Sequence, residues 1–173
     1  MENKEPDILH RGRFLELRSI NTWEYVHRHN ATGIAAIIPL HTDQRFVFIE
    51  QYRPAVDAPV IDWPAGLAGD EGEAESMLNA AKRELLEETG YEASSWTPLG
   101  QTLSSPGLTD ESVDFFLAEE LTQVGPGGGV EGEGITCHEV PADELNQWIT
   151  TMRRAGKRFD VKVYAGLGML RMI

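Results

Sequence analysis

Cysteine is almost absent from this chain of 173 residues, which contains only Cys137. A single cysteine excludes an intrachain disulfide and is typical of proteins kept in a reducing compartment. His138 follows it directly, but a zinc site needs more ligands than these two side chains, so we interpret Cys137 as structural.

Positive charge is also scarce, because 15 Lys and Arg residues stand against 28 Asp and Glu residues and give a net charge of −13. No basic stripe offsets this excess, which argues against nucleic acids and anionic membranes as partners. A small anionic substrate could bind only where a metal ion or a local arginine reverses the field. The composition fits a soluble enzyme.

Long hydrophobic runs are missing as well. The longest run, near residues 34–40, is too short to span a bilayer, and residues 1–10 are polar and acidic without the character of a targeting peptide. We therefore expect a cytoplasmic protein. Its length allows one real hydrophobic core, and we expect an N-terminal β extension at 1–33 before the main domain at 34–173.

The pattern of apolar residues and turn signals predicts a mixed sheet flanked by helices, which is an α+β fold. Strands are expected at 14–17, 22–28, 33–40, 45–51, 96–103, 113–121 and 135–140. Helices are expected at 73–89, 142–154 and 161–173, the last weakened by Gly166 and Gly168. The glycine-rich segment 124–134 is predicted to be a flexible loop.

The expected helix at 73–89 carries an unusual acidic face. Its apolar residues follow a spacing of three and four, while Glu84 and Glu88 share one face and Glu87 lies beside them. Like charges at this spacing cost a few tenths of a kcal/mol per pair, and a hard divalent cation such as Mg²⁺ would relieve that repulsion.

Residues beside the acidic face favour a metal site over the plain alternative, a solvated charged surface. Arg83 can hold one carboxylate through a charge-assisted hydrogen bond, and we count it among the candidate catalytic residues. Gly90 suits a left-handed helix C-cap.

The spacing of these residues resembles, without a gap, the signature of the Nudix hydrolases. The matching residues are Gly69, Glu75, Arg83, Glu84, Glu87, Glu88 and Gly90, with apolar Leu85 and Tyr91 at the two apolar positions. The resemblance implies an α/β/α sandwich with a mixed sheet and an N-terminal antiparallel extension, and an enzyme that uses Mg²⁺, with Mn²⁺ as a substitute.

Three further segments resemble the ADP-ribose pyrophosphatase branch of that family. They are 51–54 with 62–67, the strand 23–28, and 105–111, where Pro106 lies sixteen residues past Gly90. Asp62 departs from the pattern, because the family usually has Glu there, and the shorter side chain changes how the turn before Ala65 is braced.

The resemblance implies a metal site and a catalytic base. Glu84 and Glu88 would be the main Mg²⁺ ligands, with the Ala65 carbonyl oxygen as a third and Glu87 in support. The base in this branch usually lies in the loop before the last strand, where Glu133 fits best and Glu131 is second. Without the branch pattern, these two loop glutamates would read as solvated loop residues.

The resemblance also implies contacts to the substrate. Arg53 would meet a phosphate, Arg28 and Glu24 would address the nucleotide, and Trp23 would stack on its base. Pro106, Gly107 and Leu108 would form the marker loop for nucleoside diphosphate sugars. The plain alternatives are a packed strand aromatic for Trp23, a surface ion pair for Arg53 and an ordinary turn at 106–107.

The implied reaction is Mg²⁺-dependent hydrolysis of the pyrophosphate bond of ADP-ribose or a related ADP-sugar to AMP and a sugar phosphate. GDP-mannose or another nucleoside diphosphate sugar is the alternative substrate, a non-catalytic nucleotide-sugar sensor is a third hypothesis, and an NADH pyrophosphatase fits less well. Members of this branch are commonly homodimers with N-terminal strands packed across the interface, so Trp23 could serve the partner's site.

Overall fold

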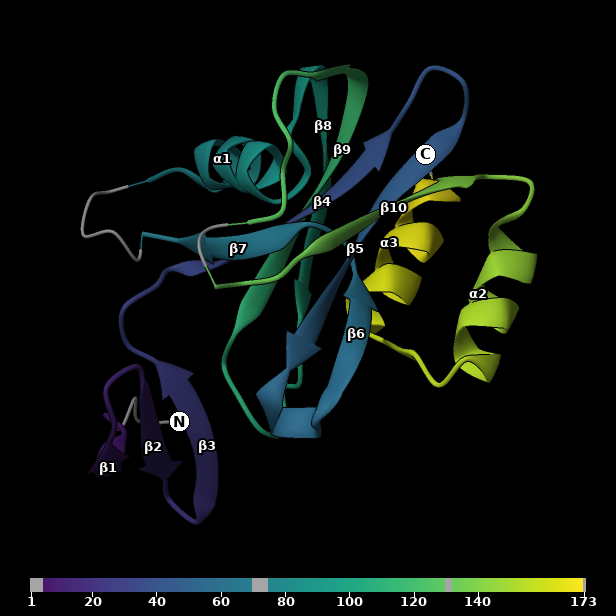
Figure 1. Ribbon diagram of the computed structural model, residues 1–173. Coiled ribbons are helices and arrows are strands. Elements are labelled where there is room, and N and C mark those ends of the chain that lie inside the picture. The colour runs from purple at the N-terminus through teal and green to yellow at the C-terminus, as the bar shows by residue number, and fades with distance from the viewer. Residues whose placement is uncertain (1–4, 70–74, 130–131, 173) are drawn as a thin grey trace.

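The computed structural model describes residues 5–69, 75–129 and 132–172, and it contains two sheets. The first is a small antiparallel sheet that projects from the rest of the molecule (Figure 1). It consists of β1 (Asp7–Arg11), β2 (Leu15–Ile20) and β3 (Trp23–Arg28). The strands predicted at 14–17 and 22–28 overlap β2 and β3, whereas β1 was not predicted.

The second sheet is mixed and has the strand order β11-β6-β5-β4-β9-β8, with β10 paired to β5 and β7 paired to β4. Its strands are β4 (Gly33–Leu40), β5 (Arg45–Arg53), β6 (Ala58–Asp62), β7 (Ala65–Ala68), β8 (Tyr91–Leu103), β9 (Ser112–Gln123), β10 (Thr136–Pro141) and β11 (Arg158–Phe159). The pairs β4–β9 and β6–β11 are parallel and the others antiparallel. The predicted α+β class with a mixed sheet is confirmed.

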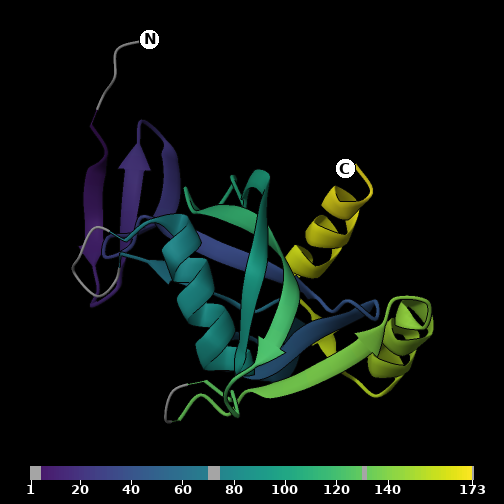
Figure 2. The same cartoon turned by 90° about the horizontal axis from the view of Figure 1, so that it is seen from above.

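Helices cover both faces of this sheet (Figure 2). Helix α1 (Met77–Thr89) lies on one side, and α2 (Leu145–Arg154) and α3 (Val161–Leu170) lie on the other. Strand β4 is apolar on both faces because Ile37 packs in the α1 layer, with Leu85, and Ile38 packs in the α3 layer, with Trp63. In the part of the chain that the structure describes, no helix is both long and apolar enough to cross a membrane.

Helix α1 begins later than predicted and ends where predicted. Ser76 caps it by accepting a hydrogen bond from the Asn79 amide, so the described helix begins at Met77; the expected start at 73 lies outside the described residues. Gly90 closes it with φ of 74°, in the left-handed conformation that glycine adopts without strain.

The glycine-rich loop after β9 is bound to the end of α1 along its described first half. The amides of Gly125, Gly128 and Gly129 donate to the carbonyls of Gly90, Glu88 and Glu87 respectively. The segment predicted to be flexible is therefore anchored on one side to the acidic helix, and this brings Glu133 towards that helix.

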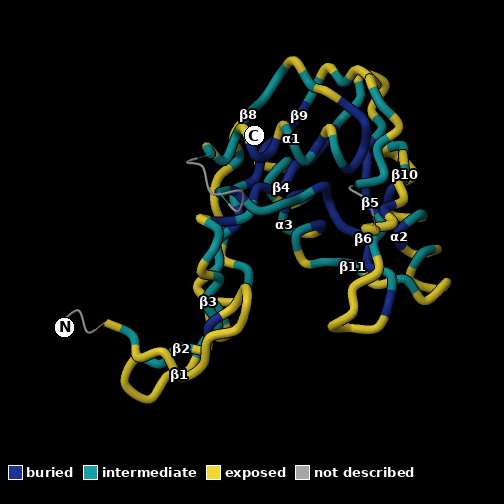
Figure 3. The backbone as a smooth tube through the Cα atoms, turned by 60° about the vertical axis from the view of Figure 1, so that its left-hand side comes forward, coloured by how far each residue is buried: buried dark blue, intermediate teal, exposed yellow. Residues whose placement is uncertain are grey.

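The small N-terminal sheet is mostly exposed or half-buried (Figure 3). Its apolar side chains include Leu15, Leu17 and Trp23, all more than a third exposed. It is fastened to the segment before β9, because the Val26 amide donates to the Leu108 carbonyl at 2.8 Å, and His27 and Arg28 pair with Asp110 and Glu111.

Candidate active site

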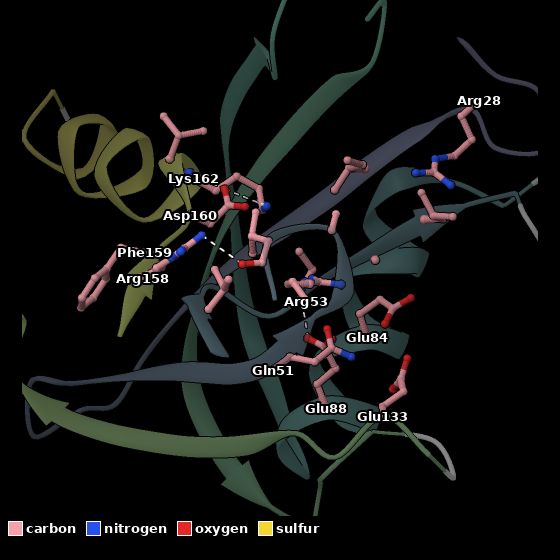
Figure 4. Close-up of a pocket in the computed structure, with 18 residues that line it drawn as sticks. Arg28, Gln51, Arg53, Glu84, Glu88, Glu133, Arg158, Phe159, Asp160 and Lys162 are labelled. Carbon is pink, nitrogen blue, oxygen red and sulfur yellow. Dashed lines mark hydrogen bonds and ion pairs between the residues drawn. The ribbon is translucent and has the colours of Figure 1, made fainter. Parts of the chain in front are cut away.

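A pocket of about 780 Å³ opens between the acidic helix and the N-terminus of α3. Figure 4 shows Arg28 and Arg158 on opposite sides of it, with Arg53 between them. Its walls come from β5, β6, β7, α1, the loop before β10 and the β11–α3 segment. Segments far apart in the sequence therefore meet around one cavity.

Three glutamates line one end of this pocket together: Glu84 and Glu88 from α1, and Glu133 from the loop (Figure 4). Glu88 is buried, and burial followed by the charge of Glu84 raises the pKa of Glu88 to about 9. Burial also raises the pKa of Glu84. The mutual repulsion of these carboxylates is relieved either by protonation or by a bound cation.

Arg83 links the glutamates of α1 to the backbone of β7. Its guanidinium donates to Glu84 at 2.8 Å, to Glu87 at 3.3 Å and to the Leu67 carbonyl at 3.0 Å, and it also contacts Glu75. Arg83 does not line the pocket, and neither does Glu87. The structure therefore brings Glu84 and Glu88 to the cavity, whereas Glu87 accepts a hydrogen bond from Arg83 outside it.

The turn at Ala65 completes this end of the pocket. The Ala65 amide donates to the Glu88 carboxylate at 2.9 Å, and β7 pairs with β4 so that Ala65 lies opposite Ala36. A Cβ on Gly66 would lie 1.8 Å from a carboxylate oxygen of Glu84. Glycine is required here, because only glycine lets the Glu84 carboxylate approach the backbone.

The donors present fit a hard divalent cation. Across residues 5–69, 75–129 and 132–172, no group of three or more His, Cys, Asp or Glu side chains is already gathered as a complete ligand set. The two pocket carboxylates and a backbone carbonyl in the nearby turn are nevertheless oxygen donors of the kind that Mg²⁺ prefers. A few protein ligands are enough for Mg²⁺, because it keeps several waters and also binds substrate phosphates. The Ala65 carbonyl remains a predicted ligand.

The pocket also contains cationic groups suited to phosphate. Arg53, at the end of β5, is exposed and takes part in no ion pair among the described residues. Arg28 lines the pocket and bonds to Glu111 at 2.9 Å. In a chain of net charge −13, these arginines can attract an anionic ligand to this cavity.

The other predicted contacts lie outside the pocket of a single chain. Trp23 is 61% exposed on β3, and Glu24 beside it is exposed as well. Pro106, Gly107 and Leu108 form an exposed turn, where the Leu108 carbonyl holds β3. Glu131 lies outside the described residues. These assignments stay predictions.

The β11–α3 segment supplies pocket residues that the sequence did not suggest. Arg158, Asp160 and Lys162 line the cavity, and Arg158 donates to the Val56 carbonyl at 3.1 Å. Asp160 caps α3 by accepting from the Lys162 amide. An aspartate before an apolar run is a helix-start signal that could have located this terminus, but no local pattern places Lys162 at the pocket.

The sheet between helices and the signature helix at the pocket together define a Nudix-type domain. The family model described as "NUDIX domain" matches residues 30–162. The chain belongs to this family.

Several named relatives share about a third of their residues with this chain over the matched region. The "Methanol dehydrogenase activator" of Bacillus methanolicus is 33% identical, over 70% of this chain and 64% of its own length. An "ADP-ribose pyrophosphatase" of Mycobacterium tuberculosis is 33% identical (72% and 62%), and a "GDP-mannose pyrophosphatase" of Escherichia coli is 34% identical (81% and 74%). For several relatives the match spans only about half to two thirds of their length.

A solved structure shares the fold. The "Crystal structure of ADP compounds hydrolase" superposes with a TM-score of 0.66 at 22% identity, over 85% of this chain and 84% of the other. The match supports the Nudix fold for this chain.

Proposed function

We propose that this protein is a metal-dependent hydrolase of nucleoside diphosphate sugars, with ADP-ribose or a related ADP-sugar as the first candidate. The observation that carries the proposal is the convergence of Glu84, Glu88 and Glu133 on one pocket that also holds Arg53. The products would be AMP and a sugar phosphate, and the metal would be Mg²⁺, with Mn²⁺ as a substitute.

The side chains divide the chemistry between them. When bound to Glu84 and Glu88, Mg²⁺ would neutralise the diphosphate and polarise water. Glu133 accepts the proton of the attacking water, whose oxygen bonds to one phosphorus while the bridging P–O bond breaks. The other phosphate leaves with the bridging oxygen. Arg53 binds the diphosphate, and Arg83 keeps Glu84 in place.

A second candidate, hydrolysis of GDP-mannose, has comparable support. Two relatives named GDP-mannose pyrophosphatase match over 81% of this chain, whereas two named ADP-ribose pyrophosphatase match over 72% and 52% of it. A sensor without turnover is the third candidate, and a relative named as an activator of methanol dehydrogenase keeps it open. The three pocket glutamates favour an enzyme over a sensor, because binding alone does not need a catalytic base.

A substrate panel decides among these candidates. Purified protein with Mg²⁺ is assayed against ADP-ribose, GDP-mannose, UDP-glucose, NADH and diadenosine polyphosphates, and the products are separated by chromatography. Turnover of one or two sugar-linked diphosphates supports the proposal and names the substrate. Binding of a nucleotide sugar by folded protein without any turnover would favour the sensor.

We also infer a cytoplasmic homodimer, built through the small N-terminal sheet. Apolar side chains on that sheet, such as Leu17 and Trp23, are exposed in the single chain. A second copy would cover them and could bring Trp23 and Glu24 to the partner's pocket. This arrangement would account for the distance of these two residues from the cavity of their own chain.

A further inference from the structure

A buried cluster of charges joins the N-terminus of α3 to the end of β6. The Lys162 ammonium lies 2.8 Å from Asp62 and 2.9 Å from Asp160, and the side chains of Lys162 and Asp62 are only 14% and 3% exposed. Lys162 and Asp160 also line the pocket. A buried charge pair costs desolvation energy that an apolar pair would avoid, so its stabilising value alone does not explain it.

The same residues hold the backbone turn between β6 and β7. The second carboxylate oxygen of Asp62 accepts from the Trp63 amide at 2.8 Å. From the other side, the Trp63 indole donates to the Lys162 carbonyl at 3.0 Å, and the Asp160 amide donates to the Ile61 carbonyl at 2.9 Å. Side chain and main chain therefore fix the turn at 62–64 against the start of α3.

This turn leads directly into the metal-site backbone. The Pro64 carbonyl accepts from the Ile37 amide, and the next amide, that of Ala65, donates to Glu88. A change of a few tenths of an ångström at Trp63 would carry over to Ala65, because only one residue separates them. Asp62 is short, and Lys162 extends from α3 to meet it at the base of the turn.

We propose that the Asp62–Lys162 pair is a positioning device that fixes the turn so that Ala65 meets Glu88 in the geometry for metal binding. Lys162 acts through Asp62 and the turn, so it is a positioning residue and not a metal ligand. The proposal rests on the proposed function, since it assumes that Glu84, Glu88 and Ala65 form the metal site.

The chain offers a matched control. Lys157 and Glu50 form a second, less buried ion pair, with the Lys157 ammonium 2.6 Å from the Glu50 carboxylate, and neither residue lines the pocket. Lys162→Met and Lys157→Met therefore remove the same charge and retain a similar stem at two sites. Only the first site touches the turn before Ala65.

The test measures metal binding without substrate, by Mn²⁺ titration followed by electron paramagnetic resonance. It also measures amide hydrogen exchange across 63–68 in metal-free protein. Lys162→Met should weaken Mn²⁺ binding by about tenfold or more, as loss of residues that orient metal ligands does. It should also speed exchange at 65–68. Lys157→Met should change neither, and Lys162→Arg, which keeps the charge, should restore most of the affinity.

Other outcomes overturn the idea cleanly. Folded Lys162→Met that binds Mn²⁺ like the wild type contradicts the positioning role, including the case in which only KM for the substrate rises. If Lys162→Met does not fold, Asp62→Asn with Lys162→Met removes both charges of the buried pair and leaves only the Asp160 carboxylate, which is partly exposed. Undiminished Mn²⁺ binding by that double variant contradicts the role equally. Wild-type protein that binds no Mn²⁺, or Glu84→Gln that binds it normally, would instead overturn the proposed function itself.

Discussion

Glu84 and Glu88 lie one helical turn apart, yet the structure gives them different surroundings. Glu84 is half-buried and held by Arg83, whereas Glu88 is buried and held by the Ala65 amide. A cation that binds both must share Glu84 with Arg83 and displace a proton from Glu88. Metal binding at this pair should therefore release a proton from Glu88.

The raised pKa of Glu88 gives the metal-free protein a specific pH dependence. The pKa of this carboxyl is about 9 in the folded chain, against an ordinary value of 4.5, so between these values the folded state holds a proton that the unfolded state has lost. The contribution of Glu88 to stability is thus present below about pH 4.5 and is lost as pH rises towards 9.

Thermal unfolding in EDTA should show that slope, and Glu88→Gln should flatten it. Mg²⁺ should raise Tm more at pH 8.5 than at pH 6, because the metal takes the deprotonated carboxylate. Equal pH slopes for wild type and variant would contradict the assignment.

Gly66 sets how closely Glu84 approaches the turn. A Cβ at this position would lie 1.8 Å from a Glu84 carboxylate oxygen and 2.6 Å from its Cγ, so the Glu84 side chain would have to move away from the turn. Gly66→Ala should therefore lower Tm only modestly but displace Glu84, with a loss of turnover of about 100-fold, the scale expected for a misplacement of about 1 Å. Calorimetry and steady-state kinetics on the same sample test this. A large fall in Tm with normal turnover per folded molecule would show that Gly66 serves stability and does not position Glu84.

At the scale of the elements, helix α3 contains two glycines, and only one of them is needed for packing. A Cβ on Gly166 would lie 2.6 Å from the Trp63 indole nitrogen and 2.8 Å from Ile38, whereas a Cβ on Gly168 meets nothing within 4 Å. The first glycine allows α3 to pack closely over Trp63. The second has no such role.

Substitution by alanine should separate them. Gly166→Ala should destabilise the fold by about 1–3 kcal/mol through overpacking. Gly168→Ala should be neutral or stabilise by up to about 1 kcal/mol, because alanine favours helix. Urea unfolding of both variants measures the difference, and equal free energies of unfolding would refute the close packing of α3.

The elements that could be predicted were those with a long apolar run or a long periodic pattern. Strand β4 is a continuous apolar run between turn signals, and helix α1 carries three-and-four spacing with Gly90 correctly marking its end. Strands β1, β6, β7 and β11 were not predicted, because segments of two to five residues are too short to show a period. The length of β8 was underestimated, since polar residues alternate along its exposed side.

The residues of the candidate site also fall into those that the sequence could predict and those that it could not. Glu84, Glu88 and Glu133 could be placed because a spaced motif and a loop position identify them. Lys162 could not, because its partner Asp62 lies 100 residues away in sequence and only the tertiary fold brings the two together. Contacts of this kind follow from packing and leave no local signal.

At the scale of the whole molecule, the projecting N-terminal sheet is the feature that one chain does not explain. Leu17 lies opposite Val26 on one face of it, and Ile20 lies opposite Trp23 on the other. A large contiguous patch of exposed apolar side chains marks an interaction site. These exposed side chains are the basis of the proposed pairing with a second copy, and either face of the sheet could be the one used.

Light scattering tests this pairing. Wild-type protein should be a dimer, and at least one of Leu17→Lys and Trp23→Lys should be a monomer, which also identifies the face used. Met172→Lys, at an 85% exposed apolar residue near the C-terminus, should remain a dimer. A monomeric wild type at working concentration would contradict the dimer.

The most direct test of the whole account is the Mg²⁺-dependent turnover of the best nucleoside diphosphate sugar by wild type, Glu84→Gln and Glu87→Gln. Glu84 lines the pocket and Glu87, three residues on, does not, so the two variants make the same chemical change at a pocket residue and at a neighbour outside the pocket lining. The account predicts that kcat/KM falls by about 1,000-fold or more for Glu84→Gln, in line with removal of a main electrostatic group, and much less for Glu87→Gln. Near-normal turnover by folded Glu84→Gln, or equal losses in both variants, would contradict it.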